Sequence, residues 1–362
     1  MPAEGRLLLV GAGHAHLHLI RHAERLRRAG YDITLVAPRW FAYSGAAASA
    51  AAGSRDPASG LIDIAALGRG RRLEHLDARA IGVDLDGRTV AVDDGRTLGW
   101  DVVSFNIGSV AAEPSGVPVD PSVVRVKPLS DLAAMREQLH AVAPEGGRRI
   151  TVVGAGPSGI ELAAQLGARP DVARVLLLES SQRPFATLPP RAARRLLALL
   201  GSRGVELHVD AAILAVGADA VTLADGRELP HDLAVLAAGL VPPPLAREPA
   251  LGGPAGIPVR ATLQHRDHDD VYAAGDCADF LLGRLARVGV HGVRQGPVLL
   301  SALEARGGDR KPPVYRPQRH ALSILDLGAG TALAVRGRWW WLGRASRLLK
   351  ERIDRRWLDA YR

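Results

Sequence analysis

The chain has 362 residues, enough for two domains of ordinary size that each bury their own core. Hydrophobic residues make up 47% of the sequence and charged residues 23%, the balance of a soluble globular protein. The net charge of +8 suits a phosphorylated ligand or an anionic membrane surface, but no zinc-finger, homeodomain or basic-zipper pattern occurs, so we expect no nucleic-acid partner.

Cys277 is the one cysteine of the chain. A single thiol can form neither an internal disulfide nor an all-cysteine metal site, so a reducing compartment is the default expectation. The apolar run at the start is too short for a signal peptide, and no stretch of 18 apolar residues occurs. We therefore expect a cytoplasmic protein, or one bound peripherally on the cytoplasmic face of a membrane.

One strand–helix–strand pattern occurs twice along the chain. The first copy has a strand at Arg6–Val10, glycines at 11 and 13, a helix over about 14–29 and a strand at Ile33–Ala37. The second has a strand at Ile150–Val153, glycines at 154 and 156, a helix over about 157–168 and a strand at Arg174–Leu178. In both copies an Asp-Gly hairpin turn precedes a final apolar strand, at an offset of 131 residues. This layout predicts an α/β fold of two tandem Rossmann-type units.

The second glycine loop is a complete G-x-G-x-x-G motif made by Gly154, Gly156 and Gly159. Glycine permits the tight turn and a close approach of the backbone to a pyrophosphate, which then faces the helix N-terminus. Glu179 ends the next strand, 25 residues after the first glycine, where a carboxylate can hold the ribose hydroxyls of NADH. The carboxylate would repel a 2′-phosphate, so NADPH is the less favoured nucleotide.

The first glycine loop departs from the motif, because His16 stands where the third glycine belongs and the next strand ends at Arg39 without an acid. A strand–turn–helix that binds no ligand is therefore the alternative at this point. Near the other end, Gly275-Asp276 follows an apolar strand. Its carboxylate could accept hydrogen bonds from the ribitol of FAD, although Gly-Asp is also a common turn.

Five motifs together resemble the two-dinucleotide-binding-domain flavoproteins, the pyridine nucleotide–disulfide oxidoreductase superfamily: Gly11–Gly13, Asn106–Ser109, Gly154–Glu161, Ala237–Gly239 and Tyr272–Asp276. Three further stretches resemble the branch with type II NADH dehydrogenases, apoptosis-inducing-factor-like flavoproteins and the module fused to selenide, water dikinase: Gly11–His18, Tyr43–Gly45 and Val293–Pro297. The resemblance covers about residues 5–300 and implies FAD and NADH as cofactors.

The resemblance divides the chain into four segments. Residues 1–115 form the first part of an FAD-binding domain, 116–250 an NAD(P)H-binding domain, 251–305 a return segment of the FAD-binding domain, and 306–362 a C-terminal segment. Several prolines between 114 and 128 place the linker near 112–127. The implied cofactor-binding residues are Gly11, Gly13, His14, Ala15, Arg39, Ala80, Asn106, Gly108, Gly154, Gly156, Gly159, Glu179, Gly239, Gly275 and Asp276.

Two residues are implied to be catalytic. Glu161 would lie near the contact of nicotinamide and flavin, with a helix-dipole acid as the alternative. Gln295, beside His291, would lie near a quinone, with a helix cap as the alternative. His14, His16 and His18 also permit a metal site, but no carboxylate cluster or cysteine joins them, so we expect the first turn of their helix to face the FAD pyrophosphate.

Disulfide reductases of the superfamily carry a C-x-x-x-x-C pair on the helix after the second strand. In this chain the corresponding region, from Tyr43 to Ala52, is rich in Ser, Gly and Ala and has no thiol. We expect Cys277, next to the FAD aspartate, to be a structural residue. Electrons must then pass directly from the flavin to an acceptor.

The segment Arg336–Arg362 has nine Arg or Lys residues against three acids. Leu349, Ile353, Trp357 and Tyr361 recur every four residues and predict one apolar helical stripe. An interfacial helix on an anionic membrane is one interpretation, and a core or homodimer contact is the other. The leading functional hypothesis is an NADH:quinone-type reductase. The alternatives are a reductase of a small redox protein, and a nucleotide-sensing or selenium-pathway accessory flavoprotein with little turnover.

Overall fold

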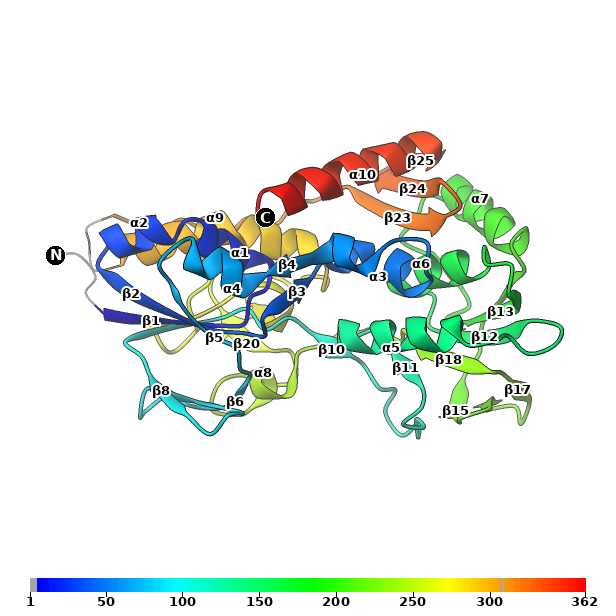
Figure 1. Ribbon diagram of the computed structural model, residues 1–362, viewed down its shortest axis with the longest axis horizontal. Coiled ribbons are helices and arrows are strands. Elements are labelled where there is room, and N and C mark those ends of the chain that lie inside the picture. Colours follow the sequence, from blue (N-terminus) through cyan, green and yellow to red (C-terminus); the bar gives the residue numbers. More distant parts are fainter. Residues whose placement is uncertain (1–4, 307, 309) are drawn as a thin grey trace.

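The computed structural model describes residues 5–306, 308 and 310–362. Two α/β units lie side by side, and a small C-terminal sheet and helix lie above them (Figure 1). The predicted fold of two Rossmann-type units with a C-terminal appendage is confirmed by the two parallel sheets. No helix in the described ranges is long and apolar enough to cross a membrane.

The first unit has a parallel sheet of order β21-β9-β1-β2-β5. These strands are β21 (Val271–Ala273), β9 (Val102–Phe105), β1 (Gly5–Val10), β2 (Tyr31–Val36) and β5 (Glu74–Leu76). Helices α1 (His14–Arg21), α2 (Ala23–Arg28), α4 (Ile64–Arg69) and α9 (Gly289–Ala305) accompany the sheet. Because helices cover it, β1 is a continuous apolar run with Leu7–Val10 buried.

Shorter elements complete the first unit. They are the antiparallel pair β3 (Trp40–Ala42) and β4 (Leu61–Asp63), the meander β6 (Ala80–Asp84), β7 (Thr89–Val92) and β8 (Thr97–Gly99), helix α8 (Pro244–Arg247), and the parallel pair β20 (Ile257–Val259) and β22 (Ala278–Phe280). Helix α3 (Ala47–Ala51) stands between β3 and β4 in the chain but packs into the core of the second unit. The chain crosses between the units at β10 (Val110–Ala111), which pairs antiparallel with β19 (Leu240–Val241).

The second unit repeats the pattern with a sheet of order β11-β18-β12-β13-β14. Its strands are β11 (Val124–Arg125), β18 (Leu233–Leu236), β12 (Arg148–Val153), β13 (Val172–Leu178) and β14 (Val205–His208), with helices α5 (Leu129–His140), α6 (Pro157–Leu166) and α7 (Pro190–Gly201) and the meander β15 (Ile213–Val216), β16 (Ala220–Leu223) and β17 (Glu228–Pro230). Pro157 stands at the first position of α6, where the N–H that proline lacks is not needed.

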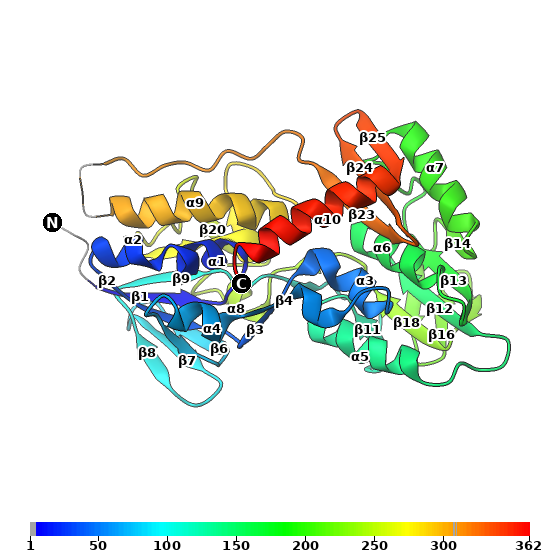
Figure 2. The ribbon, with the colours of Figure 1, turned by 45° about the horizontal axis from the view of Figure 1, so that its top comes forward.

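We call residues 323–359 the C-terminal module. An antiparallel sheet of β23 (Ser323–Gly328), β24 (Thr331–Arg336) and β25 (Trp339–Gly343) leads into α10 (Arg344–Asp359). Leu325, Leu327 and Leu333 of this sheet join the core of the second unit. Helix α10 then runs back over the first unit (Figure 2), where Trp357 and Leu358 pack against the other core.

The predicted single apolar stripe on α10 is wrong. Leu349 and Ile353 are 42% and 43% exposed, whereas Trp357 and Tyr361 pack against the first unit. An α-helix advances about 100° per residue, so a four-residue repeat drifts by about 40° at each step and does not stay on one face. Tyr361 also lies beyond the end of the helix at Asp359.

Candidate functional site

Three glycines shape the turn between β12 and α6. Gly154 has a φ of +104°, and a Cβ added to it would lie 2.4 Å from the carbonyl oxygen of Ala237. A Cβ on Gly159 would lie 1.9 Å from the carbonyl oxygen of Gly154. A Cβ on Gly156, in contrast, would meet no described atom within 4 Å. The first and third glycines are therefore required by the turn itself, and the second opens onto free space.

That space is a cavity of about 710 Å³. Its lining includes Gly154, Gly156, Ser158, Glu179 and Gly239 from the second unit. A further part of the lining, residues 284–288, comes from the loop between β22 and α9. Backbone N–H groups at the start of α6 and a glycine without a side chain are what a pyrophosphate needs for close approach. The cavity therefore fits a dinucleotide.

Glu179 follows β13 at the rim of the cavity. Burial raises the pKa of this carboxyl, but hydrogen bonds from the backbone N–H groups of Ser181 and Ala155 outweigh that effect and lower it below its usual value. The side chain is thus a fixed anion, held 3.0 Å from the nitrogen of Ala155 in the glycine loop. Its predicted role as the ribose ligand stays a prediction.

Asn106 holds the first glycine loop together. Its side-chain oxygen accepts the backbone N–H groups of Ala15 (2.9 Å) and His16 (3.1 Å), and its amide nitrogen donates to the carbonyl oxygen of Ala274 (2.6 Å). Added Cβ atoms on Gly11 and Gly13 would lie within 2.6 Å of Asn106 atoms. The close approach of these glycines to Asn106 explains why both positions require glycine.

The histidines of α1 are engaged within the protein. The ring nitrogens of His16 lie 2.6 Å from the carbonyl oxygen of Gly11 and 2.9 Å from the hydroxyl of Ser104, so this side chain ties the turn where a third glycine would stand. The ring of His14 packs against Phe41, Tyr43 and Trp357. Burial lowers the pKa of both imidazoles to about 4, which keeps them neutral near pH 7.

Asp276 follows β21 at the junction of the two units. One carboxylate oxygen accepts hydrogen bonds from the Ser109 hydroxyl (2.7 Å) and from Lys127 Nζ (3.1 Å), and Lys127 also contacts Ser109 at 2.8 Å. Sequence reasoning missed Lys127, which stands 149 positions from Asp276 in a proline-rich linker. Only the fold brings these residues together.

Other candidate residues surround this junction. Gly108 has a φ of +74°, and a Cβ on it would meet no described atom within 4 Å. Gly275 has a φ of +73°, and a Cβ there would lie 2.7 Å from the amide nitrogen of Asn106. Arg39 is exposed beyond β2 and pairs with Asp63, and Ala80 opens β6. A carboxylate, a cation and open glycine backbone at the ends of parallel strands fit the polyol and phosphates of a flavin nucleotide.

Glu161 lies on α6 beneath the C-terminal module. Its carboxylate accepts the backbone N–H of Asp326 at 2.6 Å. Burial raises the pKa of this carboxyl to about 7, and the nearby carboxylates of Asp326 and Asp354 act in the same direction. With Lys127 and Ser158, Glu161 also lines a cavity of about 50 Å³. A carboxyl that titrates near neutral pH at the junction of the units can hold or release a proton there.

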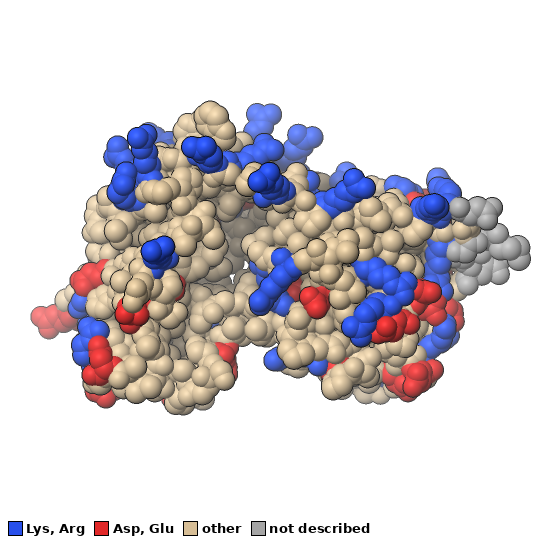
Figure 3. Space-filling model, turned by 180° about the vertical axis from the view of Figure 1, so that it is seen from behind, with Lys and Arg blue, Asp and Glu red and all other residues tan. Residues whose placement is uncertain are grey.

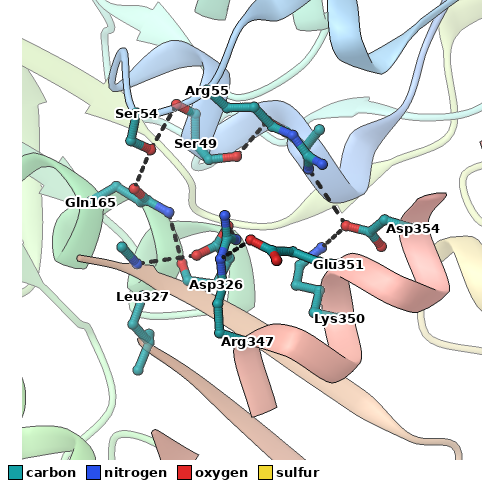
Figure 4. A network of polar contacts seen from close by, with 12 residues as sticks. Ser49, Ser54, Arg55, Gln165, Asp326, Leu327, Arg347, Lys350, Glu351 and Asp354 are labelled. Carbon is teal, nitrogen blue, oxygen red and sulfur yellow. Dashed lines mark hydrogen bonds and ion pairs between the residues drawn. The ribbon is translucent and has the colours of Figure 1, made fainter. Parts of the chain in front are cut away.

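A polar network joins the C-terminal module to both units (Figure 4). Lys350 donates to the carbonyl oxygen of Gly45 and to Asp354, each at 2.7 Å, and Asp354 also accepts the Tyr43 hydroxyl at 3.0 Å. On the second unit, the amide nitrogen of Gln165 donates to the carbonyl oxygen of Asp326 at 3.3 Å. No local sequence signal pointed to these contacts.

Gln295 lies in α9 and is 1% exposed. Its side-chain oxygen accepts the backbone N–H of Gly275 at 2.6 Å, so the residue fixes the turn that carries Asp276. His291, in the first turn of α9, contacts the Tyr315 hydroxyl at 2.8 Å. The structure therefore links Gln295 to Gly275, the residue next to Asp276. Its predicted role near the acceptor stays a prediction.

The thiol of Cys277 is buried and lies 3.3 Å from the carbonyl oxygen of Ala274. Burial raises the pKa of the thiol to about 12, so it stays protonated and is a poor nucleophile. Within the part of the chain that the structure describes, no group of three or more His, Cys, Asp or Glu residues could hold a metal ion.

Known proteins match this arrangement. A family model described as pyridine nucleotide-disulphide oxidoreductase matches residues 5–298. The ferredoxin–NAD(+) reductase component of the anthranilate 1,2-dioxygenase system of Burkholderia cepacia is 30% identical, over 91% of this chain and 84% of that protein. The type II NADH:quinone oxidoreductase NdhA of Mycobacterium tuberculosis is 26% identical, over 81% and 69%. The structure of NDH2 from Plasmodium falciparum in complex with NADH has the same fold, with a TM-score of 0.80, 12% identity and coverage of 99% and 97%.

Proposed function

Because this chain belongs to the pyridine nucleotide-disulphide oxidoreductase family and is an FAD- and NADH-dependent oxidoreductase, we propose that it reduces a quinone at an anionic membrane surface. When bound, FAD accepts a hydride from NADH and passes the electrons on. The overall reaction converts NADH, a quinone and one proton into NAD⁺ and a quinol. The chain must therefore bind two nucleotides, admit an acceptor and supply a proton.

The two glycine loops divide the nucleotides between them. In this proposal NADH lies in the 710 Å³ cavity, with its pyrophosphate at Gly156 and its adenosine ribose at Glu179. FAD lies along the first unit, where Gly108 leaves room for it and Asp276 accepts hydrogen bonds from its ribitol. Lys127 and Ser109 orient the Asp276 carboxylate for this contact. The protein contributes alignment, fixed charges and exclusion of water.

Glu161 is the proton-holding residue in this proposal. It lies at the junction of the units and shares the small cavity with Lys127. Burial brings the pKa of its carboxyl to about 7, so the group can release a proton to a quinone and take one up again near neutral pH. No thiol takes part, because Cys277 is buried and its pKa is raised to about 12.

The inverted polarity of α10 over residues 346–354, ahead of the packed residues Trp357 and Leu358, is the observation that carries the membrane proposal. Its buried side chains include Ser346, Lys350 and Asp354, whereas Leu348 is 65% exposed and Leu349 and Ile353 are 42% and 43% exposed. A surface helix of a globular protein normally has the reverse arrangement, with apolar residues inside. The buried charges bind the first unit through Gly45 and Tyr43, which leaves Leu348, Leu349 and Ile353 facing outward, where a partner can contact them.

Arginines share the exposed side of α10 with these aliphatic residues, and tryptophans are exposed on the neighbouring strand β25. Trp339 and Trp341 on β25 are 74% and 65% exposed. Arg338, Arg344, Arg352, Arg355 and Arg356 are exposed as well. Lys and Arg side chains line the upper edge of the molecule in Figure 3, the edge where α10 and β25 lie in Figure 1. Exposed tryptophan, leucine and arginine side chains on these neighbouring elements suit the interface of an anionic bilayer.

A reductase of a small acidic redox protein is the second candidate. It is favoured by the 30% identity to a ferredoxin–NAD(+) reductase component. The cationic rim would also attract an acidic protein. The large exposed tryptophan and leucine side chains argue for lipid, because docking sites of transient redox partners do not need this much apolar surface.

The test uses the FAD-loaded enzyme with vesicles containing phosphatidylglycerol. The double variant Leu348→Ser/Ile353→Ser removes an exposed apolar area equal to about one whole aliphatic side chain. Its loss should weaken vesicle binding by about 2 kcal/mol, or about 30-fold. The rate of reduction of a long-chain quinone in the vesicles should fall as vesicle binding weakens, while the rate of reduction of a water-soluble quinone should stay unchanged. Leu214→Ser, at a site that is 54% exposed on β15, is the matched control.

Two results would refute the membrane proposal. One is a wild-type enzyme that ignores anionic vesicles at low salt. The other is an enzyme that reduces a ferredoxin rapidly and reduces neither kind of quinone, which would select the second candidate.

A further inference from the structure

The loop between β22 and α9, residues 281–288, forms part of the large cavity. Residues 284–288 line it together with the glycine loop of the second unit. The loop itself belongs to the first unit, because it leads into α9, which packs against α1. A ligand in the cavity would therefore contact both units.

The loop is anchored on either side of Arg284, one of its two cavity-lining arginines. Gly283, which directly precedes the cavity-lining residues 284–288, has a φ of +149°, a conformation that favours glycine. Leu285 packs against the core of the first unit. The guanidinium of Arg287 donates to three backbone carbonyl oxygens, those of Ala255 (2.7 Å), Asp276 (3.1 Å) and Leu240 (3.4 Å). The backbone at Arg284 is thus held in place before any ligand arrives.

Arg284 and Arg287 are the two cationic residues of the cavity lining. The donors of Arg287 are engaged with carbonyl oxygens, as described above. Arg284 is exposed, and among the residues that the structure describes its guanidinium has no ion-pair partner. The lining also holds one anion, Glu179, next to the glycine loop. The pyrophosphate of NADH carries two negative charges, and the N-terminus of α6 offers only about half a positive charge.

We propose that Arg284 binds the pyrophosphate of NADH, so that the nucleotide is held by the glycine loop of one unit and by a cation of the other. Arginine is suited to this role because its planar fork matches two phosphate oxygens. The inference rests on the proposed position of NADH in the cavity. It adds a contact that a glycine motif cannot reveal, since Arg284 lies 128 positions after Gly156.

The test measures binding of ADP-ribose and of adenosine to the FAD-loaded enzyme by calorimetry. ADP-ribose carries the pyrophosphate, and adenosine carries no phosphate. Arg284→Ala should weaken ADP-ribose about 10-fold and leave adenosine unchanged, as expected for the loss of one charged hydrogen-bonding partner. Arg284→Lys should give an intermediate loss. Arg195→Ala, which removes an exposed arginine of α7 outside the cavity lining, should change neither affinity.

A third variant separates failure of this inference from failure of the nucleotide site itself. Gly156→Val places a side chain in the cavity and should abolish binding of ADP-ribose. If Arg284→Ala binds ADP-ribose like the wild type while Gly156→Val does not bind it, the site is right and the role of Arg284 is wrong. If Gly156→Val binds ADP-ribose normally, the position of NADH is wrong and the inference falls with it. Equal weakening of adenosine and ADP-ribose in Arg284→Ala would also overturn it.

Discussion

Glu161→Gln should make the enzyme more stable at pH 8 and leave it little changed at pH 5. The substitution keeps an oxygen that can accept the Asp326 N–H, now at 2.6 Å, and removes the charge that burial disfavours. Burial is the main reason that the pKa of this carboxyl is raised from 4.5 to about 7. The hydrogen bond from the Asp326 N–H and the charge of Lys350 oppose the shift, and the carboxylates of Asp326 and Asp354 add to it.

The magnitude follows from linkage between protonation and folding. The folded protein holds the Glu161 proton more tightly than the unfolded chain, so stability from this group is complete below pH 4.5 and is lost as the pH rises to about 7. Each pKa unit corresponds to about 1.4 kcal/mol of unfolding free energy, so a shift of this size corresponds to about 3 kcal/mol. Of this, about 2.5 kcal/mol is lost between pH 5 and pH 8. Glutamine has no such titration. The stability difference between variant and wild type should therefore grow by about that amount over this interval.

Urea unfolding of both proteins at pH 5 and at pH 8 measures this difference. Glu137→Gln, at an exposed position of α5, controls for the loss of one negative charge. A Glu161→Gln difference that is the same at both pH values would refute the reasoning. So would a variant that is less stable at pH 8, because the carboxylate would then be a favourable anion in the folded protein.

Three further outcomes are expected. Glu179→Gln should reduce the preference for NADH over NADPH about 10-fold or more, measured as the ratio of kcat/KM values, and an unchanged ratio would show that the carboxylate does not read the ribose. Cys277→Ser should keep NADH-driven bleaching of the flavin and turnover with an acceptor, because the buried thiol is protonated, and loss of turnover with FAD still reducible would contradict a thiol-free route. Lys350→Met should cost about 3–5 kcal/mol of unfolding free energy by leaving Asp354 without its closest cation. Lys350→Met/Asp354→Leu should cost less than Lys350→Met alone, and a double-variant cost equal to the sum of the Lys350→Met and Asp354→Leu costs would show that the pair is not coupled.

The glycine loops could be predicted from the sequence because strand, turn and helix follow one another within a short stretch of chain. In the turn between β12 and α6, Gly159 approaches the carbonyl oxygen of Gly154, a contact within that stretch. Gly154 itself approaches Ala237, which stands 83 positions further along the chain, so the need for glycine there is explained only by the fold. The apolar strands of a parallel sheet could also be predicted from the sequence, because they are buried on both faces.

The rest of the site depends on contacts between distant segments. Lys127 reaches Asp276 across 149 positions, and the Asp326 N–H reaches Glu161 across 165. Neither Lys127 nor Asp326 stands in a sequence motif that predicts these contacts. The stripe on α10 shows the opposite error, since a regular four-residue spacing was visible but the tertiary contacts of Trp357 divided it between two environments.

The region from Tyr43 to Ala52, which carries redox cysteines in disulfide reductases, has a different use in this chain. Tyr43 and Gly45 hydrogen-bond to Asp354 and Lys350 of α10 instead of presenting thiols. The opposite side of α10 exposes Leu348 and Ile353. In the proposed function one helix therefore joins the flavin unit to the surface where a lipid-soluble acceptor is found. A segment without thiols and a helix that exposes Leu348 and Ile353 are then two parts of one direct route from flavin to acceptor.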